Sequence, residues 1–75
     1  MFKKRELKKA IIESENTLAD LEQKRNRSQA AILYATVNNT EAPEADKEIF
    51  NLYTQLIDLE RKHLISLKEE LEALN

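Results

Sequence analysis

The feature that most constrains the fold of this chain is the regular spacing of apolar residues between Ile49 and Leu74. Residues that recur here at alternating steps of three and four are apolar, with Glu60 as the one exception: Phe50, Tyr53, Ile57, Leu64, Leu67, Leu71 and Leu74. Side chains with this spacing lie on one face of an α-helix. Because a long apolar face needs a partner surface, the stretch predicts a helix that packs against another helix.

A second series with the same spacing runs through the first half of the chain. Its members are Leu7, Ile11, Ser14, Leu18, Leu21, Arg25, Ser28, Ile32 and Ala35. The spacing is sustained for about four heptads, long enough to predict a coiled-coil-like helix. We refer to the two series as the seams of the two helices. The first seam is the thinner one, because it includes small and polar side chains.

The segment between the seams carries the signals of a turn. The chain has no glycine, and Asn38 and Asn39 are the residues next best suited to the left-handed conformation that ends many helices. Thr40 is expected to cap the second helix. Pro43, the one proline, fits the first turn of that helix, where a missing N–H group is harmless.

These signals predict an all-α fold, an antiparallel two-helix hairpin that forms a single domain over residues 1–75. We expect the first helix at about 3–38, the turn at about 39–43 and the second helix at about 43–74. The alternative is one long helix that bends at Pro43 and pairs with other chains. The asparagine-rich segment before the proline favours the turn.

The seams can be aligned if facing residues lie equally far from a turn centred between Ala42 and Pro43. This alignment places large residues opposite small ones, as close packing requires. The only two charged residues within the seams, Arg25 and Glu60, then face each other. Since either charge alone would be costly, we expect them to form an ion pair that fixes the register. The other expected pairs are Ser14 with Leu71, Leu18 with Leu67, Ser28 with Ile57, Ala35 with Phe50, Glu22 with Arg61, and Glu15 with Lys68.

The second helix is also apolar beside its seam. Ile49, Leu52, Leu56 and Leu59 form a second row that a single partner helix cannot cover. We therefore predict a homodimer in which two hairpins pack these rows together as a four-helix bundle. The alternatives are partial exposure on a monomer and a patch that binds a different protein. A chain this short has a small core, and without cysteine it cannot be stabilised by a disulfide, which also favours association.

A basic cluster near the start of the first helix is the strongest charge feature. It comprises Lys3, Lys4, Arg5, Lys8 and Lys9. One interpretation is a contact with the phosphate backbone of RNA or DNA, or with an anionic membrane surface. The other, which we favour, is local compensation by the acidic end of the second helix, where Glu69, Glu70 and Glu72 lie.

No residue pattern indicates catalysis, a metal site or a cofactor. The chain has no glycine for a phosphate-binding loop, no cysteine nucleophile, and a single histidine, His63, whose nearest hydroxyl at helical spacing is that of Ser66. No apolar run reaches the roughly 18 residues that span a bilayer, and no apolar segment of a secretory signal follows the basic start. We therefore expect a cytoplasmic, non-enzymatic protein without cofactors.

The function predicted from these features is that of a small interaction protein. It would associate with itself and present helix faces to a protein partner, in an adaptor, chaperone-like or accessory role. The alternative is a nucleic-acid-binding regulator that uses the basic cluster. The net charge of −2 does not decide between them.

Overall fold

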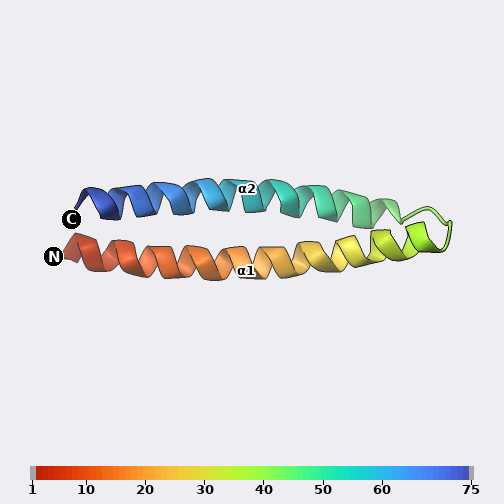
Figure 1. Ribbon diagram of the computed structural model, residues 1–75, viewed down its shortest axis with the longest axis horizontal. Coiled ribbons are helices and arrows are strands. Elements are labelled where there is room, and N and C mark those ends of the chain that lie inside the picture. Colours follow the sequence, from red (N-terminus) through yellow and green to blue (C-terminus); the bar gives the residue numbers. More distant parts are fainter. Residues whose placement is uncertain (1, 75) are drawn as a thin grey trace.

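The computed structural model describes residues 2–74, which form two antiparallel helices lying side by side (Figure 1). Helix α1 spans Phe2–Val37 and α2 spans Glu44–Ala73, within one residue of the predicted ranges. The hairpin is a rod of 57 × 16 × 14 Å with both ends of the chain at one end of the rod. The all-α hairpin is therefore confirmed, and a continuous helix through Pro43 is excluded.

The first helix ends because Asn39 adopts the left-handed conformation, with φ of 53°. The N–H of Asn39 then donates to the carbonyl of Thr36 at 3.1 Å, and the N–H of Thr40 donates to the carbonyl of Ala35 at 2.8 Å. These two bonds are those of a Schellman motif, which satisfies carbonyls that the helix end would otherwise leave without donors. Asn38 adds a side-chain hydrogen bond to the carbonyl of Tyr34 at 2.7 Å. The prediction for this helix end is confirmed.

The start of α2 differs from the prediction. Thr40 does not cap α2, because its hydroxyl donates to the carbonyl of Ala35 at the end of α1. Pro43 lies just before the first turn, in an extended conformation, and its carbonyl accepts from the N–H groups of Asp46 and Lys47. No side chain caps this end, but Glu44 and Asp46 place negative charge in the first turn, where the helix dipole favours it.

The core lies along the two predicted seams. On α1, all nine residues of the seam are buried or half-buried; the buried ones are Leu7, Ser14, Leu18, Ser28 and Ala35. On α2, Ile57 is the most buried large side chain, with 1% of its surface exposed. Leu74 departs from the prediction and is 46% exposed, since it follows the last residue of α2 at the open end of the hairpin.

The relative alignment of the helices differs from the predicted one. Glu60 contacts Ser14, which lies about 16 Å along α1 from Arg25, the predicted partner. Ser14 also does not lie opposite Leu71, the residue predicted to face it. Leu71 lies about 16 Å along α2 from Glu60, which Ser14 contacts. Figure 1 shows the cause: α1 reaches further toward the turn than α2 does, so facing residues are not equally far from the turn.

Among the described residues, two salt bridges link the helices. Arg61 lies 3.6 Å from Glu22, as the sequence predicts, and Lys3 lies 3.5 Å from Glu70. The predicted pair of Glu15 with Lys68 does not form between these described side chains, and Lys3 with Glu70 is the ion pair found nearer the open end.

Neither helix of residues 2–74 is long and apolar enough to cross a membrane.

Candidate interaction surface

The four apolar residues that the sequence places beside the α2 seam remain exposed in the hairpin. The exposed fractions are 40% for Ile49, 52% for Leu52, 37% for Leu56 and 62% for Leu59. We call these four residues the α2 row. Their spacing of three, four and three puts them on one line of the helix, next to the line that contains Ile57 and faces α1. A contiguous line of large aliphatic side chains on a small hairpin is the kind of surface that marks an interaction site.

Other exposed apolar side chains lie apart from this row. Leu33, Tyr34 and Val37 occupy the last turns of α1, and Ile12 lies near its other end. Ile65 is 56% exposed and has no role predicted from the sequence. The sequence pattern gives little reason to assign Ile65 to an apolar face. Ile65 has no apolar neighbour three or four residues before it, and it belongs to neither the seam of α2 nor the α2 row.

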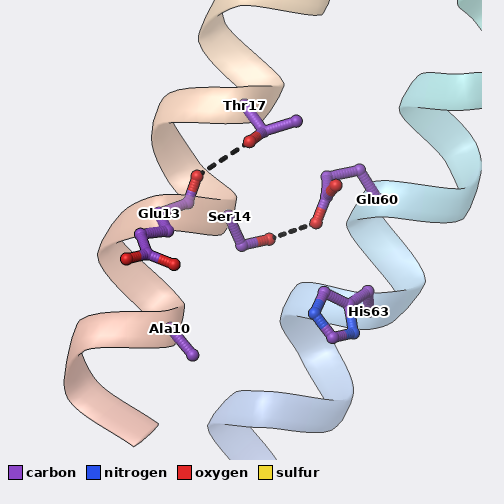
Figure 2. Close-up of a pocket in the computed structure, with 6 residues that line it drawn as sticks. All are labelled: Ala10, Glu13, Ser14, Thr17, Glu60 and His63. Carbon is purple, nitrogen blue, oxygen red and sulfur yellow. Dashed lines mark hydrogen bonds between the residues drawn. The ribbon is translucent and has the colours of Figure 1, made fainter. Parts of the chain in front are cut away.

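A small polar cleft of about 220 Å³ lies between the helices nearer the open end. It is lined by Ala10, Glu13, Ser14, Thr17, Glu60 and His63 (Figure 2). Figure 2 shows the carboxylate of Glu60 reaching across to α1, where the hydroxyl of Ser14 donates to Oε2 at 2.6 Å. The hydroxyl of Thr17 instead donates to the carbonyl of Glu13 in its own helix. The hydroxyls of this cleft are therefore already used within the fold.

The cleft has the residue types of an acid–base site but lacks its geometry. His63 is exposed, and no hydrogen bond joins it to Ser14, Ser66 or Glu60 among the described residues. A nucleophile needs a base within hydrogen-bond reach and a donor pair for the developing oxyanion. Within residues 2–74, no group of three His, Asp or Glu side chains is arranged to hold a metal ion.

The predicted ion pair between Arg25 and Glu60 is wrong. Glu60 accepts from Ser14, and the buried Nε of Arg25 has no hydrogen-bond partner. The physical reason is the alignment of the helices, which separates the two side chains along the hairpin axis. Arg25 is half-buried, so its long apolar stem fills the seam while one donor goes unsatisfied. A buried donor without an acceptor is costly, so we expect Arg25 to lower the stability of the hairpin.

The basic cluster is partly compensated within the hairpin. Lys3 pairs with Glu70 at 3.5 Å, while the remaining members, Lys4, Arg5, Lys8 and Lys9, are exposed and form no ion pair with described residues. The favoured interpretation of local compensation thus applies to one of the five side chains. The others are free to contact an external anion.

Elsewhere on α1, Lys24 pairs with Asp20 at 3.0 Å. The hydrogen bond that Lys24 donates to the Asp20 carboxylate, together with the negative charge of that carboxylate, raises the pKa of Lys24 above its usual value. Both groups are solvent-exposed, so this pair acts as an ordinary helix-surface contact between residues four apart.

Comparisons with known proteins found no matching family model, no matching curated protein and no matching solved structure.

Proposed function

We propose that this protein is a non-catalytic helical hairpin that associates with itself and presents helix faces to a protein partner. The observation that carries the proposal is the α2 row, a line of four large aliphatic side chains of which each is between 37% and 62% exposed. Covering a Leu or Ile completely stabilises a protein by about 1.5–3 kcal/mol. A second apolar surface on this row therefore recovers a large part of the stability that so small a core lacks.

The proposed assembly is a homodimer in which two hairpins form a four-helix bundle. Support comes from the shape of the apolar surface, since a straight row on a straight helix suits another straight helix. Three further exposed side chains, Leu33, Tyr34 and Val37, lie on the other helix, α1, in its last turns. They are the surface that we assign to a protein partner, by the mode in which an amphipathic helix docks on an apolar groove.

The absence of catalysis is part of the proposal. It is supported by the hydrogen bond between the buried Ser14 and the half-buried Glu60, which occupies the one hydroxyl–carboxylate pair that bridges the helices in the described polar cleft. An activated nucleophile needs a base that a third group orients, and no other described side chain forms a hydrogen bond with Glu60.

Sedimentation equilibrium at about 5–200 µM, the range in which moderate dimers dissociate, tests the association. We expect wild-type protein to be dimeric, and Leu52→Glu to be monomeric because the change buries a charge in the contact. Ile65→Glu is the matched control, because it makes the same kind of change at a side chain of similar exposure off the row, and it should remain dimeric. A wild-type monomer across the whole range would overturn the proposal.

A second candidate function is favoured by the four exposed basic side chains that lack ion pairs in the described hairpin, Lys4, Arg5, Lys8 and Lys9. Their cluster could neutralise phosphates of a nucleic acid, and such binding weakens as salt is raised. Fluorescence anisotropy with mixed-sequence RNA and DNA at low salt tests it. Binding that disappears when all four are changed to Gln supports this function, and binding that is absent or indifferent to the change rejects it.

A further inference from the structure

We propose that the partner of the α2 row is a second copy of this chain whose α2 runs antiparallel, about a twofold axis that crosses α2 at the level of Thr54. The two turns then lie at opposite ends of the assembly. This inference rests on the self-association proposed above and specifies its geometry.

The α2 row aligns with a second copy of itself about this axis. An axis at the level of Thr54 lies midway along the row, between Leu52 and Leu56. Ile49 is then level with Leu59 of the second copy, and Leu52 is level with Leu56 of the second copy. All four exposed side chains are covered in apolar layers of the kind found in coiled coils.

The next residues along the same line support the same direction. Ala45 precedes the row by one step and His63 follows it by one step. In the antiparallel arrangement the small Ala45 is level with His63 of the second copy, so a large side chain meets a small one. In a parallel arrangement two imidazoles would meet at one end of the row and two methyl groups would leave a gap at the other.

Side chains of opposite charge border the α2 row along one side. Glu48, Gln55 and Lys62 are seven residues apart, so they form one column along α2, and all three are exposed. The helical spacing puts this column on the opposite side of the α2 row from Ile57, which faces α1. It therefore borders any helix that covers the row.

The antiparallel arrangement brings the opposite charges of this column together. Glu48 comes within about 3 Å, along the axis, of the level of Lys62 of the second copy. Symmetry repeats this pair at the other end, and the two Gln55 amides meet between them. In a parallel arrangement Glu48 and Lys62 stay about 21 Å apart along the axis and cannot pair.

The ion pairs already present leave both side chains available. Lys62 lies 3.2 Å from Asp58 of its own helix, but its side chain is 72% exposed and can reach outward. Glu48 forms no ion pair with any described residue of the hairpin. The contact thus adds a partner for Glu48 and a second acceptor for Lys62, which sets the orientation of the dimer more than its strength.

Charge reversal tests the orientation. Glu48→Lys and Lys62→Glu should each raise the dimer dissociation constant by roughly two- to thirtyfold, because each places like charges together at two symmetric positions. The double variant should restore the wild-type value. Lys68→Glu, which changes an exposed charge outside the column, is the matched control, and circular dichroism checks that each variant remains helical.

A distance measurement provides an independent readout, because the chain has no cysteine and a single introduced one labels cleanly. Glu72 lies about 27 Å beyond the level of Thr54, so spin labels at Glu72→Cys should be about 50 Å apart in the antiparallel dimer. Labels at Gln55→Cys should be below about 20 Å apart. Short distances at both positions, or a dimer indifferent to the charge reversals, would overturn the antiparallel geometry while leaving self-association intact. A wild-type monomer in sedimentation would instead remove the self-association on which it rests.

Discussion

The hydroxyl of Ser14 on α1 donates a hydrogen bond of 2.6 Å to Oε2 of Glu60 on α2. Ser14 is buried and Glu60 is half-buried, so the bond gives an acid within the seam a partner from the facing helix. It also joins specific positions of the two helices. The apolar layers alone would tolerate a slip by one heptad, because a seam repeats with that period. This polar contact is therefore the part of the interface that distinguishes one alignment of the hairpin from the next.

Ser14→Ala should lower the free energy of unfolding by about 1–3 kcal/mol, because Glu60 loses the donor that compensates its partial burial. Ser28→Ala is the matched control. Ser28 is equally buried on the same seam, yet its hydroxyl makes no hydrogen bond to another side chain in the described hairpin. Chemical denaturation of both variants measures the difference. Equal losses for the two serines would contradict a special role for the bond.

Arg25→Met should stabilise the protein by about 1 kcal/mol, because it removes a buried donor that lacks an acceptor and keeps an apolar stem of similar length. Arg27→Met, at an exposed position two residues away, should change stability by less than about 0.5 kcal/mol. Thermal denaturation compares the two. A loss of stability in Arg25→Met would mean that the charge is satisfied in solution.

Arg25 and Glu60 should behave as independent sites. In a double-mutant cycle with Arg25→Met and Glu60→Gln, the coupling energy should be below about 0.5 kcal/mol, because the two side chains do not contact each other. Urea denaturation of the four proteins in the cycle provides the values. A favourable coupling above about 1 kcal/mol would restore the ion pair that the sequence alone suggests.

Asn39→Gly should raise the free energy of unfolding by about 0.5–1 kcal/mol, because glycine adopts the left-handed conformation at φ of 53° without steric strain. Asn38→Gly is the control, since Asn38 contributes a side-chain hydrogen bond and does not need a left-handed backbone; it should be destabilising. Opposite signs for the two neighbours are expected in thermal denaturation. A gain at Asn38 would contradict the assignment of the helix end.

The melting temperature of the wild-type protein should rise with protein concentration if the α2 row is covered in a homodimer. The melting temperature of Leu52→Glu should be lower and independent of concentration, because that variant unfolds as a monomer. Differential scanning calorimetry over a hundredfold range of concentration makes the comparison. A melting temperature that is constant for wild-type protein would argue against association.

The sequence by itself determined the two helices, the way in which α1 ends and most of the residues that each helix turns toward the other. These properties are local: the spacing of apolar residues selects a helix face, and Asn39 is the residue that the left-handed position at the end of α1 requires in a chain without glycine. The exposed α2 row was also predictable, because one helix cannot cover two neighbouring lines of another.

Only the tertiary structure decided how far α1 is displaced along α2. That displacement depends on the path of the six residues between the helices, where Thr40 turns back onto the end of α1 instead of capping α2. The pattern of apolar residues repeats every heptad, so it does not distinguish between alignments of the two helices that differ by one heptad. For this reason Glu60 bonds to Ser14 while the Nε of Arg25 is left without a partner, the reverse of what the charges alone suggest.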